Sequence, residues 1–476
     1  MKKAYVAGEW VETGQEMAVI NPFSGEVVDS VAVCGPAEID QALSQAVASQ
    51  AAIRRLAPYQ RAMALARVRD GIEAQKEQFV RTLSQENGKT LAESRLEVTR
   101  SIATFDIAVG EATRIQGEAY DLGINALAVG RQALVRRHPI GVVSAIAPFN
   151  FPMNLAIHKI APAMACGCPV VLKPASKTPL TALMLAELIQ ESGWPLGAFS
   201  VLPCDRVAGQ LLVTDERIKL LSFTGSPEVG WKMKREAGKK KVVLELGGNA
   251  GLIVDRDVRD WDWLIARAVM GAFYQCGQVC ISVQRIFLHQ DIVGEFRARF
   301  KAATEALRSG DPLDAQTTLG PVIDRANRER LQIWIQEALD QGAELVSGNT
   351  VIPMGQGNNL TATILEEVHP GCRVTADEAF GPVVTLTSVE SMEEAFQRAN
   401  DSRFGLQCGI FTNDFDTVMR AFDVLEVGGV IHNDVPSFRV DSMPYGGVKD
   451  SGLGREGVKY AMDDMLENRV LVYRSL

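Results

Sequence analysis

A cysteine and a glutamate, each set among small residues, give this chain a soft nucleophile and a carboxylate base. Cys280 lies in the segment Gly-Gln-Val-Cys (277–280), and Glu245 lies in Leu-Glu-Leu-Gly-Gly (244–248). A thiolate can attack a carbonyl carbon and hold the product as a thioester, and a carboxylate can activate the water that hydrolyses it. Each residue alone has an ordinary alternative, because most lone cysteines are small buried hydrophobes and most glutamates lie in solvent.

A third residue that could take part in this chemistry is Asn150, in Pro-Phe-Asn-Phe-Pro (148–152). The segment follows the apolar run 141–147, which predicts a buried strand. The two prolines favour an extended turn just past the strand end. The Asn150 carboxamide could therefore donate to a developing oxyanion, which is worth about 3–4 kcal/mol of barrier in a hydrolase oxyanion hole. An asparagine that satisfies a turn is the alternative.

Residues 141–246 alternate strand, turn and helix at the spacing of βαβ units. Their strands are continuous apolar runs, as expected when both faces of a sheet are buried. The pattern predicts a doubly wound parallel sheet, with ligands at the carboxyl ends of the strands. The predicted strand 219–223 is followed by Gly225 and Ser226, and backbone N–H groups at such a helix start can bind an anion. This loop is not the standard dinucleotide fingerprint.

Other elements follow from apolar spacing. Helices are expected at 38–55, 60–86, 92–114, 260–276, 291–307 and 324–341. Further strands are expected at 169–172, 284–288 and 383–387, which places a second α/β unit after Gly248. The segments 117–139 and 459–476 fit neither unit.

Composition limits the classes of partner. The 476 residues carry a net charge of −9 without a basic stripe, which argues against nucleic acid. No run of about 18 apolar residues is present, so no membrane span is expected. The first ten residues lack the apolar run of a signal peptide. Eight scattered cysteines suit a reducing compartment, and we expect a cytoplasmic protein. Cys276 and Cys280 have no second Cys/His pair at zinc-like spacing, so no metal is expected.

Taken in order along the chain, seven motifs resemble those of the aldehyde dehydrogenase superfamily. They are Pro-Phe-Asn-Phe-Pro, Lys-Pro-Ala-Ser (173–176), Phe-Thr-Gly-Ser (223–226), Glu-Leu-Gly-Gly, Gly-Gln-Val-Cys, Glu-Ala-Phe-Gly-Pro (378–382) and Pro-Tyr-Gly-Gly-Val-Lys-Asp-Ser-Gly (444–452). The resemblance covers nearly the whole chain. It is greatest to the branch that contains lactaldehyde and non-phosphorylating glyceraldehyde-3-phosphate dehydrogenases, on the segments 277–285 and 438–447.

This resemblance implies an α/β fold with three parts. A Rossmann-like NAD(P)-binding domain would comprise residues 1–116 and 140–247, and an α/β catalytic domain residues 248–450. A small β oligomerisation flap would comprise residues 117–139 and 451–476. The family's flap pairs between subunits, so the resemblance implies a homodimer or homotetramer.

The family mechanism can be carried over residue by residue. Cys280 would attack a small aldehyde, the Asn150 side chain and the Cys280 backbone N–H would stabilise the oxyanion, and Glu245 would activate water to hydrolyse the thioester. The cofactor, NAD or NADP, would contact Lys173, Ser176, Gly225, Ser226, Glu378 and Phe380. Taken alone, Glu378 could equally form a surface salt bridge, and Phe380 could be ordinary core.

Two departures refine this assignment. Members restricted to NAD often carry a glutamate three residues after the ribose lysine, where it repels a 2′-phosphate. Here that position is Ser176, followed by Lys177, so we expect use of both NAD and NADP. Members that transfer the acyl group to coenzyme A tend to lack the base, so the presence of Glu245 favours hydrolysis over that alternative.

The substrate is expected to be a small hydroxyaldehyde or anionic semialdehyde. Glyceraldehyde 3-phosphate, succinic semialdehyde and a sulfonated aldehyde are the alternatives. Arg439 could bind a distal anion bidentately, or instead pair with Asp441 or Asp434. Residues expected to line the substrate tunnel are Phe151, His158, Val279, Ile281, Phe438 and Tyr445. His158 suggests a polar tunnel, and Val279, which is not arginine, weakens the case for a phosphate.

Overall fold

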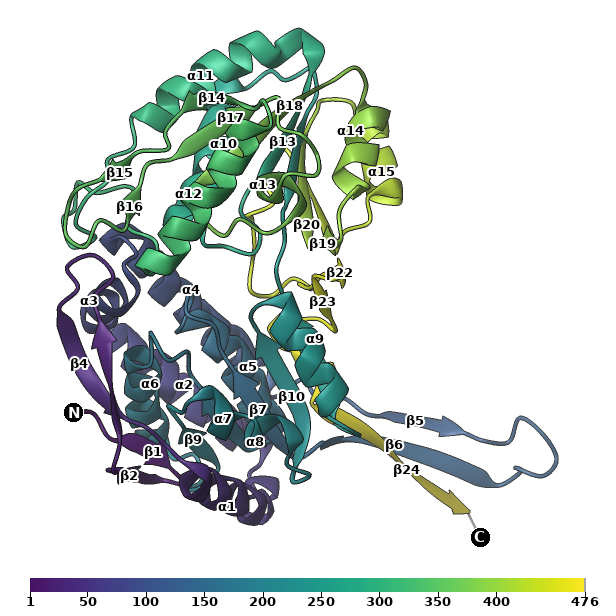
Figure 1. The fold of residues 1–476 in the computed structure, drawn as a ribbon. Coiled ribbons are helices and arrows are strands. Elements are labelled where there is room, and N and C mark those ends of the chain that lie inside the picture. Colours follow the sequence, from purple (N-terminus) through teal and green to yellow (C-terminus); the bar gives the residue numbers. More distant parts are fainter. Residues whose placement is uncertain (475–476) are drawn as a thin grey trace.

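The computed structural model describes residues 1–474 and contains two large sheets, each flanked by helices (Figure 1). The first has the order β2-β1-β9-β8-β7-β10-β11-β23, and its five strands from β9 to β11 are parallel. Its strands are β1 (Ala4–Val6), β2 (Glu9–Val11), β7 (Val142–Ile146), β8 (Val170–Lys173), β9 (Phe199–Val201), β10 (Ile218–Thr224), β11 (Lys241–Glu245) and β23 (Gly452–Leu453).

The helices of this first unit include the amino-terminal group and the crossovers between the parallel strands. They are α1 (Pro36–Arg54), α2 (Pro58–Ala74), α3 (Lys76–Asn87), α4 (Leu91–Glu111), α5 (Asn154–Cys166), α6 (Leu180–Glu191), α7 (Arg206–Gly209), α8 (Leu211–Thr214), α9 (Pro227–Glu236) and α16 (Val458–Asp464). The range 60–86, expected as one helix, is two, because the chain breaks at Gln75 between α2 and α3.

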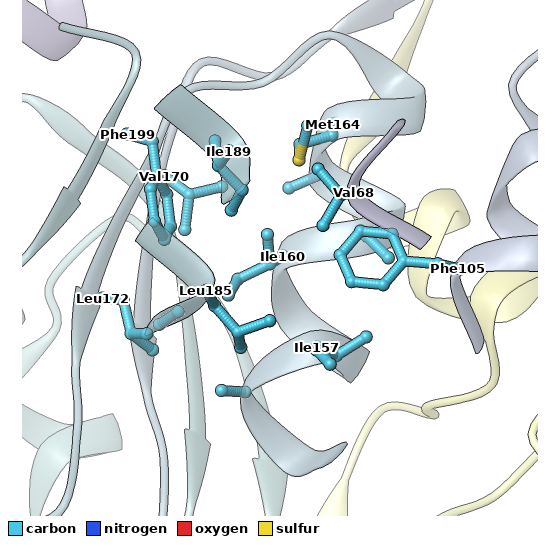
Figure 2. Close-up of a cluster of buried hydrophobic side chains, with 14 of the residues drawn as sticks. Val68, Phe105, Ile157, Ile160, Met164, Val170, Leu172, Leu185, Ile189 and Phe199 are labelled. Atoms are coloured by element: carbon cyan, nitrogen blue, oxygen red, sulfur yellow. The ribbon is translucent and has the colours of Figure 1, made fainter. Parts of the chain in front are cut away.

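Helix α5 forms the centre of the first unit, and all of its residues are buried. Figure 2 shows Ile157, Ile160 and Met164 of this helix pointing into a cluster with side chains of β8 and α6. A helix that is apolar on every side must be covered by other elements. This burial fixes the loop that precedes α5, which carries Asn150.

The second unit contains a seven-stranded sheet of order β14-β17-β18-β13-β12-β20-β21, parallel except for the β14–β17 pair. Its strands are β12 (Gly251–Val254), β13 (Arg285–His289), β14 (Glu344–Ser347), β17 (Thr363–Glu366), β18 (Val383–Val389), β20 (Gln407–Phe411) and β21 (Gly429–His432). Its helices are α10 (Trp261–Phe273), α11 (Val293–Glu305), α12 (Arg325–Asp340), α13 (Arg373–Ala376), α14 (Met392–Asn400) and α15 (Phe415–Val424), with 3₁₀ turns η1 (Tyr274–Gly277) and η2 (Gln290–Ile292).

A three-stranded antiparallel sheet projects from the body of the molecule (Figure 1). It contains β5 (Glu118–Asp121), β6 (Arg131–Pro139) and β24 (Leu466–Arg474). Three two-stranded pairs complete the fold: β3 (Glu16–Ile20) with β4 (Val27–Ala32), β15 (Val351–Ile352) with β16 (Asn359–Leu360), and β19 (Phe404–Gly405) with β22 (Val448–Lys449).

The range 451–476, expected as part of the flap, divides in the structure. Strand β23 joins the first sheet beside β11, and α16 packs on α4 and α5, so this stretch belongs with the first unit. Only β24 lies in the projecting sheet, and residues 475–476 of the range lie outside the described residues. Within residues 1–474, none of the helices has both the length and the apolar character needed to cross a membrane.

Candidate active site

A cleft with a volume of about 690 Å³ is lined by residues of both units. Its walls bring together six residues predicted from sequence: Asn150, Gly225, Ser226, Cys280, Glu378 and Phe380. The carboxyl ends of β7, β10 and β11 supply one wall through the segments that follow them. This is the location where a parallel α/β sheet binds ligands.

The nucleophile loop has an unusual backbone. Gln275 and Cys276 have positive φ values of 49° and 55°, and Gly277 has φ +68°. A Cβ on Gly277 would lie 2.0 Å from the Gly381 carbonyl oxygen, so only glycine fits here. Left-handed residues cost free energy and persist where the surroundings fix them, and the backbone N–H of Gln275 is held by the Glu93 carboxylate of α4 at 2.5 Å.

Asn150 is buried, and both its side-chain amide and its backbone carbonyl form hydrogen bonds. Its Nδ2 donates to the Gln278 carbonyl oxygen at 2.9 Å, and its backbone carbonyl accepts from Lys89 Nζ at 2.9 Å and from the Gln275 side chain. A carboxamide has two N–H donors, so one remains for an oxyanion beside Cys280. The position is therefore suited to the role predicted for Asn150.

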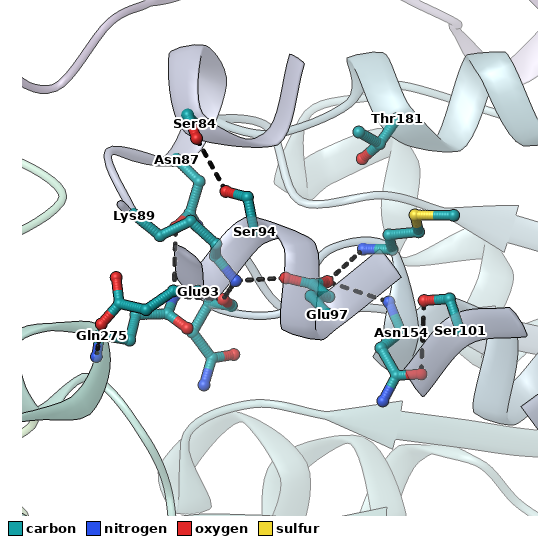
Figure 3. A network of polar contacts seen from close by, with 12 residues as sticks. Ser84, Asn87, Lys89, Glu93, Ser94, Glu97, Ser101, Asn154, Thr181 and Gln275 are labelled. Carbon is teal, nitrogen blue, oxygen red and sulfur yellow. Dashed lines mark hydrogen bonds and ion pairs between the residues drawn. The ribbon is translucent and has the colours of Figure 1, made fainter. Parts of the chain in front are cut away.

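A buried network of charged side chains, on α4 and just before it, holds the loop of Cys280 and the loop of Asn150 in place (Figure 3). Lys89 and Glu97 form an ion pair with no exposed side-chain surface, and Glu97 also accepts from the backbone N–H groups of Met153 and Asn154, each at 3.0 Å. Removing one partner of such a pair strands a buried charge. The network therefore fixes the start of α5, and with it the Asn150 loop, in one position. Lys89 and Glu97 were not predicted from the sequence, because the sequence of α4 alone does not indicate which of its faces meets the active site.

Cys280 Sγ lies 3.0 Å from the hydroxyl of Tyr445. Burial raises the pKa of the Cys280 thiol to about 12, and the hydrogen bond from Tyr445 opposes that shift. A cluster of apolar side chains encloses the sulfur, comprising Phe151, Leu155, Val279, Ile281, Leu406 and Tyr445. Of the predicted tunnel residues, Phe151, Val279, Ile281 and Tyr445 thus meet around the nucleophile.

Glu245, the candidate base, is 3% exposed. Neither of its carboxylate oxygens has a hydrogen-bond partner within residues 1–474. Burial, and then the charge of Glu456, raise the pKa of Glu245 well above its usual value. A carboxylate in this state is a stronger base once it ionises, which is the property that general-base catalysis requires.

Behind Glu245 lies a second buried ion pair. Lys159 Nζ lies 2.9 Å from Glu456 and 2.7 Å from the Thr224 hydroxyl, and Thr224 is the register partner of Glu245 between β10 and β11. Burial acts to raise the pKa of Glu456, but the charges of the neighbouring cations together lower it. The pairing of Lys159 with Glu456 was not predicted from the sequence, because no local sequence pattern links two residues so far apart in the chain.

The cofactor side of the cleft matches a dinucleotide. Glu378 accepts from the Gly248 backbone N–H at 2.9 Å, and burial raises its pKa to about 7. A Cβ on Gly247 would lie 2.4 Å from Glu378 Oε2, so the small residue keeps this wall open. Ser226 occupies the N-cap position of α9, where free backbone N–H groups can bind phosphate. The residues present therefore fit NAD or NADP.

Three residues expected near the adenosine lie at the margin of this cleft. Lys173 ends β8 and packs beside Gly209, outside the residues that line the main cleft. Ser176 and Lys177 line an adjoining cavity, and Lys177 pairs with Asp324. Lys177, the possible cation next to Ser176, thus has a carboxylate partner in the structure.

Arg439 was expected either to bind a distal anion or to pair with Asp441 or Asp434, and neither expectation fully describes its contacts. It is buried, its guanidinium lies 3.1 Å from Glu456 and 3.7 Å above the Tyr445 ring, and Asp441 is 4.0 Å from its Nε. Asp434, the other predicted partner, pairs with Arg267 instead. The predicted tunnel residue His158 is also buried and contacts both Asp441, at 2.9 Å, and Arg439. Phe438, in contrast, is 41% exposed.

Comparison with known proteins decides the family. The model of the aldehyde dehydrogenase family matches residues 10–471. The chain belongs to this family. The resemblance seen in the motif order is thus confirmed, together with the expected α/β fold. The enzyme oxidises an aldehyde to the carboxylic acid with NAD or NADP.

Three relatives illustrate the similarity of this aldehyde dehydrogenase to characterised proteins. The 3-sulfolactaldehyde dehydrogenase of Priestia aryabhattai is 40% identical over 469 residues, which are 98% of this chain and 97% of the relative. Aldehyde dehydrogenase 21 of Physcomitrella patens, solved with the reaction product succinate, is 44% identical with a TM-score of 0.97, covering 99% of this chain and 98% of that one. The glyceraldehyde-3-phosphate dehydrogenase of Methanocaldococcus jannaschii, solved with NADP, is 35% identical with a TM-score of 0.92, covering 97% and 100%.

No group of three or more His, Cys, Asp or Glu side chains in residues 1–474 is arranged to hold a metal ion. The eight cysteines are all free thiols. Cys280 differs from the other seven in being only partly buried, which suits a nucleophile that must meet a substrate.

Proposed function

We propose that this enzyme oxidises a short aldehyde whose far end carries a carboxylate or sulfonate. The observation that carries the proposal is an excess of positive charge next to the nucleophile. The partly exposed Arg100 and the buried Lys159 and Arg439 share a cluster with two carboxylates of lowered pKa, Asp441 and Glu456. The cluster therefore has one cation more than it has anions.

The other titratable groups facing the cluster do not cancel this excess. Burial and the charge of Arg439 lower the pKa of His158, which favours its neutral form. The raised pKa of Glu245 likewise favours its neutral form. Arg439 also keeps its Nε without a hydrogen-bond partner within residues 1–474. A distal anion would supply the missing charge, and guanidinium groups suit planar or tetrahedral oxyanions.

The relatives support an anionic aldehyde. One acts on 3-sulfolactaldehyde by its name, and another was solved with succinate as its reaction product. Both substrates would place a charged group a few bonds from the aldehyde carbon. The Arg439 guanidinium stacks on the ring whose hydroxyl contacts Cys280, so it lies one side chain away from the sulfur.

The geometry of the cleft supports the following roles. Cys280 attacks the aldehyde carbon to form a thiohemiacetal, and the remaining Asn150 N–H stabilises the oxyanion. When bound, the nicotinamide cofactor accepts the hydride. Glu245 takes the proton of the water that attacks the resulting thioester, and its buried position makes it a strong base. Glu378 and Ser226 hold the cofactor at the other side of the cleft.

Arg439→Ala tests the substrate proposal. Its kcat/KM should fall selectively for 3-sulfolactaldehyde and succinic semialdehyde, because only these use the charge. The loss should correspond to about 2–5 kcal/mol, as for truncating a buried hydrogen-bonded charge. Arg439→Lys should recover only part, because an ammonium lacks the bidentate fork. Initial rates with each aldehyde, with lactaldehyde as the neutral comparison, measure the difference.

Arg267→Gln is the matched control, since it breaks a comparable Arg–Asp pair at the same loop without touching Tyr445. It should not discriminate between the aldehydes. Equal losses for charged and neutral substrates in Arg439→Ala would assign Arg439 to packing. Neutral hydroxyaldehydes such as lactaldehyde would then be the better assignment.

We infer further that both NAD and NADP are used in turnover, because Ser176 places no carboxylate next to a 2′-phosphate. Ser176→Glu should raise KM for NADP by about tenfold or more, the effect of one added like charge at partial exposure, and leave KM for NAD within a few-fold. Lys177→Met should change neither KM strongly, because that lysine is committed to Asp324. A Ser176→Glu variant with unchanged NADP kinetics would remove Ser176 from the cofactor site.

The predicted division into a cofactor domain (1–116 and 140–247), a catalytic domain (248–450) and a flap remains our proposal, as does assembly into a homodimer or homotetramer in the cytoplasm. The projecting sheet supports assembly, because β24 exposes four consecutive large side chains, Val470, Leu471, Val472 and Tyr473. Exposed contiguous apolar surface commonly marks an interface. Free thiols at all eight cysteines suit a reducing compartment. Light scattering of the purified protein would give the subunit number.

A further inference from the structure

The hydroxyl of Tyr445 makes the one side-chain hydrogen bond that Cys280 has within residues 1–474, at 3.0 Å. Tyr445 is 3% exposed, and its hydroxyl has no other hydrogen-bond partner among these residues. Among these residues the two side chains are therefore each other's one side-chain hydrogen-bond partner. Its direction, from oxygen to sulfur or from sulfur to oxygen, determines how reactive the nucleophile is.

The ring of Tyr445 is fixed on several sides. Its backbone pairs with Glu456 through two hydrogen bonds, of 3.1 Å and 2.6 Å. The Arg439 guanidinium covers one face at 3.7 Å from the ring centroid, and the ring also packs in the apolar cluster around Cys280. A cation over the ring stabilises it in place and withdraws electron density from the phenol. The hydroxyl is thus a positioned and strengthened donor.

We propose that Tyr445 is a catalytic residue whose hydroxyl donates a hydrogen bond to the Cys280 thiolate and so favours the ionised, reactive nucleophile. Hydrogen bonds to the charged form of a group stabilise that form. Burial and the nearby cysteine raise the pKa of Tyr445 well above its usual value, so the phenol keeps its proton and serves as a donor, not a base. Burial raises the pKa of the Cys280 thiol, and the hydrogen bond of Tyr445 acts in the opposite direction.

The effect should fall on the first half of the reaction. The thiolate is charged before it attacks, and its charge passes to the carbonyl oxygen once the carbon–sulfur bond forms. The contact with Tyr445 therefore stabilises the free nucleophile, and it does not take the proton of the attacking water, which is the role of Glu245. This role is independent of the charge on the substrate, so it stands whether or not the proposed anion is correct.

Tyr445→Phe tests the proposal in the cofactor-free protein. We expect alkylation of Cys280 by iodoacetamide at pH 7.5 to slow by at least about tenfold, the effect of losing a hydrogen bond to a charged group. The pH midpoint of alkylation should move upward. Mass spectrometry of the modified peptide assigns the reaction to Cys280, and Cys280→Ala gives the background.

Tyr274→Phe is the matched control, because Tyr274 packs against Phe151 of the same cluster and its buried hydroxyl has no partner within residues 1–474. Its alkylation profile should match that of the wild type. Thermal midpoints of both variants show whether the fold is kept. Deleting a hydroxyl opens space beside the sulfur, so a slower reaction of Tyr445→Phe cannot be a steric effect.

The opposite results would overturn the proposal. Alkylation of Tyr445→Phe at the wild-type rate would show that the contact does not influence the thiol, and faster alkylation would show that Cys280 donates to Tyr445 and is restrained by it. In turnover, the pre-steady-state burst should slow for charged and neutral aldehydes equally. A loss confined to hydrolysis would also contradict the assignment.

Discussion

Cys280→Ala should retain less than a few per cent of the wild-type kcat for any aldehyde. The thioester route has no substitute nucleophile, because the other seven cysteines are buried away from the cleft and burial disfavours their thiolates. Cofactor binding should stay within a few-fold, since the residues proposed to bind it, Glu378 and Ser226, are unchanged. Steady-state oxidation followed by reduced-cofactor absorbance, together with equilibrium titration of NADP, measures both quantities.

Cys372→Ala is the matched control, because Cys372 is a fully buried thiol of the second unit that does not line the cleft. It should keep near wild-type turnover while losing some thermal stability through the small cavity. Substantial oxidation by Cys280→Ala would mean that the chemistry does not pass through an enzyme thioester. The roles assigned to Asn150 and Glu245 would then fail with it.

Much of the cleft was predictable because its residues follow strand ends. Parallel strands bring their carboxyl ends to one edge, so the apolar runs that became β7, β10 and β11 placed Asn150, Ser226 and Glu245 at one edge of the first sheet. The meeting of these residues with Cys280, which belongs to the second unit, was not predictable from periodicity. It followed from the order of family motifs.

The residues behind the cleft were not predictable in the same way. Lys89 and Glu97 lie on or beside one helix, and local patterning gives no reason to bury both charges. Lys159 and Glu456 meet only through tertiary packing. Charged residues are usually solvated, so the sequence alone predicts that such residues lie on the surface. The buried state of Arg439 escaped prediction for the same reason, since its partner Glu456 was not suspected.

Glu245→Gln should separate the two halves of the reaction. The variant should still release a burst of reduced cofactor of about one equivalent per active site, because oxidation of the thiohemiacetal precedes the step that needs the base. Steady-state turnover should then fall by about 10²–10⁴-fold, the usual contribution of a general base. Glutamine keeps the size of the side chain and breaks no hydrogen bond among the described residues, because Glu245 has none there, so the fold should persist.

The pH dependence gives an independent check on the same residue. Burial and Glu456 raise the pKa of Glu245, and only the ionised form can take a proton from water. The wild-type rate of thioester hydrolysis should therefore increase with pH through that raised pKa, and the increase should be absent in Glu245→Gln. Stopped-flow absorbance at several pH values resolves the burst from the slow phase. If the burst itself disappeared, Glu245 would instead serve to activate Cys280, and water activation would have to be assigned to another group facing the thioester.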